Sequence, residues 1–159
     1  MKRVVVIGGG VAGCAAAVAA AEAGAAVTLI ERDHQLGGAA ARGEHRTICG
    51  LAAIDAERAE LLEPDLTAAW VEVLSTGAAQ RRGRVWLWPT ESGALQAGLR
   101  RRLDQTGVEI CTGIPVNTVQ IAAGRITAIA GRACTEVVDA AGVLPRLLGL
   151  PLVPASQWA

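Results

Sequence analysis

The sequence predicts an α/β fold in which a parallel sheet has helices on both faces and carries a small β-meander. Two short apolar runs, at 2–7 and 26–30, flank an alanine-rich segment at 11–23. Further along, a helix-like segment at 91–105 precedes another apolar run at 108–113. Alternating strand and helix patterns of this kind are typical of a parallel sheet.

Length and composition favour one globular domain and exclude some classes of partner. The chain has 159 residues, and its 52% apolar content is enough for a hydrophobic core. Lys plus Arg and Asp plus Glu both number 15, so no net charge draws the chain to nucleic acid or acidic lipid. No apolar run reaches the roughly 18 residues of a membrane-spanning helix. We therefore expect neither a nucleic-acid partner nor a membrane.

The four cysteines, Cys14, Cys49, Cys111 and Cys134, are scattered along the chain. No CxxC pair occurs, so the pattern indicates neither a zinc site nor a thioredoxin-type redox pair. Nothing in it requires an oxidising compartment. We expect no bound metal and a cytoplasmic location.

The opening stretch, MKRVVVIGGGVAGC, allows two interpretations. It resembles a lipoprotein signal, with basic residues, an apolar run and small residues before Cys14. It also reads as a strand, a glycine turn and the start of a helix. The glycines interrupt the run and would cost a signal helix about 1 kcal/mol each. The second interpretation accounts for more residues, and it places Cys14 in a helix facing the sheet.

The glycine turn has the spacing of a dinucleotide-binding loop, Gly8-x-Gly10-x-x-Gly13. The first glycine permits a tight turn, the second lets the backbone approach a pyrophosphate, and the third lets the helix pack closely on the strand. Val11 and Ala12 begin the helix, where free amides and the helix dipole favour an anion. This unit predicts a Rossmann-like domain.

An acidic residue follows the second strand at the expected distance. Glu31 lies 23 residues after Gly8, close to the spacing of an acid that accepts hydrogen bonds from a ribose. Its charge opposes a 2′-phosphate, so the pattern favours FAD or NAD over NADP. Arg32 comes next and is counted with it as a candidate cofactor contact. The choice between FAD and NAD stays open on these residues.

The run GGGVAGCAAAVAAAEAGAAVTLIERDHQLGG resembles the N-terminus of FAD-dependent oxidoreductases with a glutathione-reductase-type fold. In that superfamily a short loop with a glycine pair follows the acidic residue, and Gly37 and Gly38 match the pair. The resemblance implies FAD as cofactor, with these two amides near its diphosphate or ribityl chain. An ordinary glycine turn is the alternative.

The middle of the chain predicts an insertion that is mainly helical over about 51–78. Its composition is helix-favouring, and Pro64 is expected to divide it into two helices. The alternating run at 80–89 predicts a strand with Trp86 and Trp88 on one face. The tryptophans are interpreted as core or interface packing, or as the lining of a flavin or substrate pocket.

The segment from 90 to 142 predicts the rest of the nucleotide domain. Thr90 and Ser92 are candidate caps for the helix at 91–105. Two alternating runs around Gly124 predict a hairpin, and TEVVDA at 135–140 predicts a last strand.

This order also resembles the FAD-dependent superfamily. The resemblance places the backbone of Val116 against adenine and assigns Gly142 and Asp139 to a second nucleotide-associated motif. That motif usually ends in Ala-Thr-Gly, whereas Ala141 stands at the threonine position here.

The predicted domain covers 1–150, and an apolar tail covers 151–159. Members of this superfamily usually continue into a substrate domain. We therefore expect that another chain, in a homo- or hetero-oligomer, or a further part of the protein completes the site, or that the chain is a reduced, non-catalytic relative.

In flavin enzymes the cofactor performs the electron transfer, so no catalytic triad is required. His45 and Cys49, in the loop GEHRTICGL, are the weak catalytic candidates. A thiolate near a flavin could exchange electrons, and a buried structural thiol is the alternative. The sequence predicts an FAD-binding oxidoreductase, or the FAD-binding part of one, that oxidises an unidentified small molecule. A non-catalytic nucleotide-binding subunit and an NAD-binding protein without flavin are the alternatives.

Overall fold

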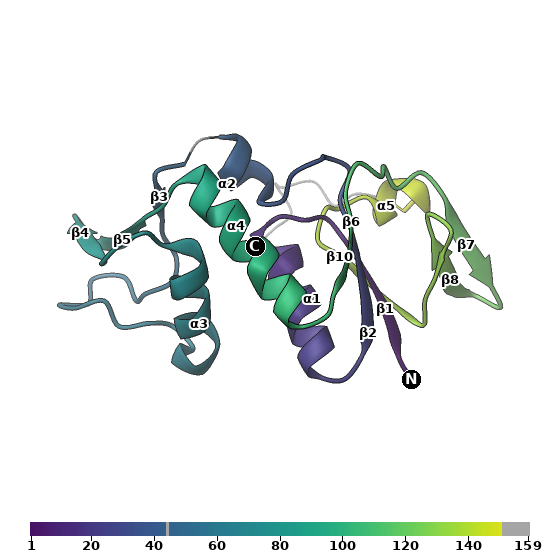
Figure 1. Cartoon of the computed structure of the whole chain (residues 1–159), viewed down its shortest axis with the longest axis horizontal. Helices are drawn as coiled ribbons and strands as arrows, with labels where there is room; N and C mark the ends of the chain where they lie inside the picture. Colours follow the sequence, from purple (N-terminus) through teal and green to yellow (C-terminus); the bar gives the residue numbers. More distant parts are fainter. Residues whose placement is uncertain (44, 151–159) are drawn as a thin grey trace.

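The computed structural model describes residues 1–43 and 45–150 (Figure 1). The apolar tail expected at 151–159 lies outside the described residues. A central sheet separates two layers, with long helices on one side and a small antiparallel sheet on the other.

The central sheet has four parallel strands. In chain order they are β1 (Arg3–Ile7), β2 (Ala26–Ile30), β6 (Glu109–Cys111) and β10 (Glu136–Asp139), and their order across the sheet is β10-β1-β2-β6. β1 is buried over Val4–Ile7, as its unbroken apolar run predicts. The parallel sheet expected from the sequence is therefore confirmed.

Helices cover one face of this sheet. α1 (Val11–Glu22) packs on β1 and β2, and α4 (Ser92–Gln105) packs beside α1 and against β6 (Figure 1). The small alanines of α1 let the helix approach the strands closely. The core between these layers contains Val4, Val6, Leu29, Leu95, Leu99 and Leu103.

The other face is covered mainly by the predicted meander. It consists of β7 (Val119–Ala122), β8 (Arg125–Ile129) and β9 (Arg132–Ala133), and the short helix α5 (Leu144–Leu147) follows β10. The turn between β7 and β8 has positive φ at Ala123 and Gly124, 49° and 72°, as a two-residue hairpin turn requires. Its core joins Val5, Ile7, Ile30, Cys111, Ile129 and Cys134.

The segment between β2 and α4 projects beyond the helical layer (Figure 1). It contains α2 (Gly38–Arg42), β3 (Thr47–Ile48), α3 (Pro64–Leu74), β4 (Gln80–Arg82) and β5 (Val85–Pro89). The three strands form an antiparallel sheet in the order β3-β5-β4.

Two helices were predicted in this segment, one before and one after Pro64, and the prediction of the helix before Pro64 is wrong. Residues 51–63 are turns and loops, and Pro64 begins α3 instead of dividing two helices. Residues of the following hairpin contact the loop at 51–63. Arg84 forms an ion pair with Asp55 through two of its nitrogens, with Nη2 2.6 Å from Oδ2. Trp86 Nε1 donates to the carbonyl oxygen of Ala56 at 3.1 Å. These long-range contacts favour a loop over the local helix propensity.

The single strand expected at 80–89 is a hairpin. Gly83, with φ of 60°, turns the chain between β4 and β5. Trp88 is 5% exposed and packs in the interior, whereas Trp86 is half-buried. The tryptophans therefore serve the packing of this segment.

Thr90 and Ser92 do not cap α4. The N-cap is Glu91, which makes no side-chain capping bond. Thr90 Oγ1 donates to the carbonyl oxygen of Leu74 at 2.6 Å, and Ser92 Oγ donates to that of Ala41 at 3.0 Å. The two hydroxyls thus fasten the start of α4 to the ends of α3 and α2.

Candidate functional site

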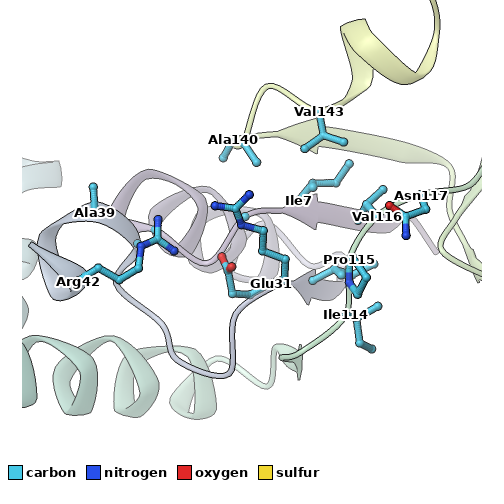
Figure 2. Close-up of a pocket in the computed structure, with 16 residues that line it drawn as sticks. Ile7, Glu31, Ala39, Arg42, Ile114, Pro115, Val116, Asn117, Ala140 and Val143 are labelled. Carbon is cyan, nitrogen blue, oxygen red and sulfur yellow. The ribbon is translucent and has the colours of Figure 1, made fainter.

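A cavity of about 470 Å³ opens at the carboxyl ends of β1, β2 and β10 (Figure 2). Ligands of open α/β sheets bind at this edge. Five chain segments form its walls: the glycine loop after β1, the turn after β2, helix α2, the segment after β6 and the segment after β10. The lining residues used below are Gly8, Gly10, Glu31, Arg32, Gly38, Arg42, Val116 and Ala141.

The glycine loop has the geometry that its spacing predicts. Gly8 has φ of +104°, which side-chain-bearing residues rarely adopt. A Cβ on Gly13 would overlap the carbonyl oxygen of Gly8, so only glycine allows α1 to pack here. A Cβ on Gly10 would meet no atom nearer than Gly38 Cα at 4.0 Å. Gly10 therefore keeps space open in the cavity, and Gly13 acts through packing alone.

The N-terminus of α1 is available to an anion. Gly10 is its N-cap, no side chain caps the helix, and its first turn contains no acidic residue. The first amides of a helix have no partner within the helix and attract negative charge. Val11 is half-buried and Ala12 is exposed, and neither residue is part of the cavity lining.

Glu31 lines the cavity with a carboxylate that the backbone already orients. The residue is 6% exposed, and its Oε2 accepts from the amide of Gly9 at 2.5 Å. Its Oε1 accepts from the amide of Asp33 at 2.8 Å. Arg32 is exposed at the same wall.

The glycine pair brings α2 against the glycine loop. Gly37 has φ of +100°, and its amide donates to the carbonyl oxygen of Gly9 at 2.8 Å. A Cβ on Gly38 would lie 3.1 Å from Gly10 Cα, and Gly38 lines the cavity, whereas Gly37 does not. The two predicted glycine elements are therefore neighbours in space.

The segment after β6 forms the opposite wall. The amide of Ile114 donates to the carbonyl oxygen of Glu31 at 3.0 Å, and that of Gly113 donates to the carbonyl oxygen of Asp33 at 2.9 Å. These bonds fix Ile114, Pro115 and Val116 as an apolar surface facing the space beside Glu31 (Figure 2).

The turn after β10 closes the third side through Ala140, Ala141 and Val143. Gly142 has φ of +67° and does not line the cavity itself. Asp139 shapes this turn, since its carboxylate accepts from the amides of Ala141 at 3.1 Å and Leu144 at 2.8 Å. Its contribution is structural in these contacts.

The catalytic candidates are not brought to this cavity. His45 and Cys49 are both exposed and line none of its walls. Cys14, by contrast, is fully buried, and its Sγ donates to the carbonyl oxygen of Gly9 at 3.4 Å. Burial, assisted by the nearby Glu31 charge, raises the pKa of Cys14 to about 12, which keeps this residue a neutral thiol.

Sequence reasoning missed Gly9 and Arg42. A Cβ on Gly9 would lie 2.7 Å from Leu36 Cδ2 and 3.0 Å from Glu31 Cβ, so the middle glycine of GGG is also closely packed. Arg42 lines the cavity from the last residue of α2. Its place four residues after Gly38, one helical turn away, is the signal that could have identified it.

Comparison with known proteins assigns the chain to a family. The model of the FAD dependent oxidoreductase family matches residues 3–144. The chain therefore belongs to the FAD-dependent oxidoreductases, a family that uses FAD as cofactor. No curated protein matches the chain.

Solved structures share the fold. Thermovibrio ammonificans THI4 is 17% identical with a TM-score of 0.62, covering 95% of this chain and 64% of that chain. FqzB is 22% identical with a TM-score of 0.61, and the match covers 93% of this chain and 38% of FqzB. A flavoprotein/dehydrogenase from Cytophaga hutchinsonii is 20% identical with a TM-score of 0.57, covering 96% and 43%. The chain thus spans less than two thirds of the length of each.

Among the described residues, 1–43 and 45–150, no helix has the length and apolar character to cross a bilayer.

Proposed function

We propose that this cavity binds the ADP half of FAD, with the diphosphate against Gly10 and the start of α1. The observation that carries the proposal is the uncapped N-terminus of α1 beside the side-chain-free space at Gly10. A diphosphate there would accept hydrogen bonds from backbone amides and interact favourably with the helix dipole. Gly8 and Gly13 support the same loop by packing.

The remaining walls suit adenosine. An ionised carboxylate has about four lone-pair positions, and the backbone uses two of those on Glu31. The others can accept from ribose hydroxyls. The apolar wall at Ile114, Pro115 and Val116 offers a surface for adenine, and Arg32 lies beside it.

The reaction that we propose is hydride or electron transfer from an unidentified small molecule. FAD, when bound, supplies the redox chemistry, and the residues of this chain bind and orient it. His45 and Cys49 lie outside the cavity, so we assign them no role in binding the ADP half. The four cysteines are free, which supports a cytoplasmic location.

A second candidate is a nucleotide-binding subunit that acts only with a partner chain. Three apolar side chains in and before α3 favour it, because Ile54, Leu62 and Leu66 are 65%, 48% and 60% exposed. If a partner copy covers them, the melting temperature should rise with protein concentration and the protein should sediment as an oligomer. A concentration-independent melting temperature and a monomeric species would contradict this candidate.

Titration with FAD, NAD and riboflavin tests the proposed function. The fluorescence of FAD should change saturably on binding, and FAD should raise the melting temperature of the protein. Riboflavin lacks the ADP half and should bind far more weakly. Stabilisation by NAD without any effect of FAD would instead favour an NAD-binding protein, and no effect of either dinucleotide would refute the proposal.

A further inference from the structure

We propose that Arg42 binds the cofactor diphosphate by exchanging its present partner, the carboxylate of Asp33, for the phosphate oxygens. The inference rests on the proposed binding of FAD and adds a positioning residue from α2 to that site. Its basis is the place of Arg42 between two cavities.

Arg42 belongs to the wall of both cavities. It lines the main cavity together with Gly8, Gly10 and Gly38. It also lines a smaller neighbouring cavity of about 180 Å³, to which Asp33 belongs and the glycine loop does not. Figure 2 shows its side chain extending from α2 into the main cavity, on the side where Glu31 also points. Rotation of the Arg42 side chain would therefore exchange its contact with Asp33 for a contact with a ligand in the main cavity.

The charges that line the main cavity favour contact between Arg42 and an anionic ligand. Its lining contains one acid, Glu31, and two cations, Arg32 and Arg42. Arg32 follows β2, on the side assigned to adenosine. Arg42 is carried by α2, whose first residue, Gly38, adjoins Gly10. A guanidinium can donate two parallel hydrogen bonds to phosphate oxygens.

The present ion pair is easily exchanged. Arg42 Nη1 contacts Asp33 Oδ2, yet Asp33 Oδ2 accepts no aligned hydrogen bond among the described residues. The Arg42 and Asp33 side chains are 53% and 36% exposed, and ion pairs at such positions contribute little to stability. Arg32 Nε lies 3.7 Å from Asp33 Oδ1, so Asp33 keeps a nearby cation when Arg42 leaves.

Binding of FAD, ADP and adenosine to matched variants tests the inference. Arg42→Gln should weaken binding of ADP and FAD about tenfold, because it removes a charge-assisted contact. It should leave the affinity for adenosine unchanged. Arg42→Lys should give an intermediate loss, and Arg46→Gln, at an exposed residue outside both cavities, should change none of the three affinities.

Asp33→Asn separates exchange from a purely structural role. This variant keeps the backbone amide that Glu31 uses and removes the competing charge, so ADP should bind more tightly than to the wild type. Equal ADP affinity of Arg42→Gln and wild type, an equal loss for adenosine, or weaker ADP binding by Asp33→Asn would each overturn the inference. If the wild-type protein binds neither ADP nor FAD, the proposed function itself fails.

Discussion

The carboxylate of Glu31 accepts a hydrogen bond from the backbone amide of Gly9, 22 residues earlier, at an N–O distance of 2.5 Å. The bond joins the end of β2 to the glycine loop after β1. Because the other carboxylate oxygen accepts from the amide of Asp33, a single side chain orients both loops of the candidate site. Glu31 thus shapes the cavity in addition to facing it.

Glu31→Gln should lower both stability and affinity for FAD. Glutamine offers one acceptor oxygen, so one of the two amides would face an NH₂ group and lose its hydrogen bond. We expect a loss of about 1–3 kcal/mol in the free energy of unfolding, measured by urea denaturation. Glu57→Gln, at an exposed residue, is the control and should stay near the wild type. Equal stability of both variants would show that the Glu31 bonds contribute little.

Gly13→Ala and Gly10→Ala should separate folding from binding. The Cβ at position 13 would overlap the carbonyl oxygen of Gly8, so α1 could not pack and we expect the melting transition to be lost or strongly lowered. The Cβ at position 10 has space, so Gly10→Ala should fold normally and bind FAD more weakly. Thermal melts and FAD titration of both variants check this. A well-folded Gly13→Ala would contradict the packing account.

Gly98→Ala should loosen the contact between α3 and α4. A Cβ at Gly98 would overlap the carbonyl oxygen of Val73, and such overpacking costs about 1–3 kcal/mol. Gly93→Ala is the matched control in the same helix, because its Cβ would meet no atom within 4 Å. Alanine favours a helix over glycine by up to about 1 kcal/mol, so the control should be neutral or stabilising in a denaturant melt.

The first strand, glycine loop, helix and second strand could be predicted from the sequence because their signals are local. β1, α1 and β2 are continuous apolar or alanine-rich segments separated by glycines with positive φ at Gly8 and Gly24. The glycine requirement at position 13 follows from spacing alone. These elements also define most of the candidate site.

The segment from 51 to 92 could not be predicted in the same way, because distant contacts decide it. Local propensity favours a helix before Pro64, but Arg84 and Trp86 hold that stretch as a loop from the next hairpin. The hydroxyl of Thr90 resembles a cap in sequence, yet it bonds to Leu74, 16 residues away. Arg42 was missed although it lies one helical turn after Gly38, because the helix in which that spacing counts was not predicted from the sequence.

The buried Cys14 thiol should make stability depend on alkaline pH. The pKa of this thiol is raised from 9.0 to about 12 in the folded protein, so the unfolded chain loses its thiol proton at a lower pH than the folded one. The contribution of the neutral thiol to the free energy of unfolding is therefore complete below pH 9 and is lost as the pH rises from 9 towards 12. In that window, wild-type stability should fall relative to Cys14→Ala by up to about 1.4 kcal/mol per pH unit. Urea denaturation at pH 8, 9 and 10 measures the difference. A gap that does not change with pH would contradict a buried neutral thiol.

The central claim is that a diphosphate binds at the glycine loop, and amide chemical shifts during titration with ADP test it most directly. A ¹H–¹⁵N correlation spectrum should show its largest changes at Gly10, Val11 and Gly38, with smaller ones at Val116. The exposed residues Gly83 and Gly131, at distant turns, should not move. Saturable changes confined to the glycine loop and its walls are the predicted result. Changes centred elsewhere, or none at millimolar ADP, would contradict the account.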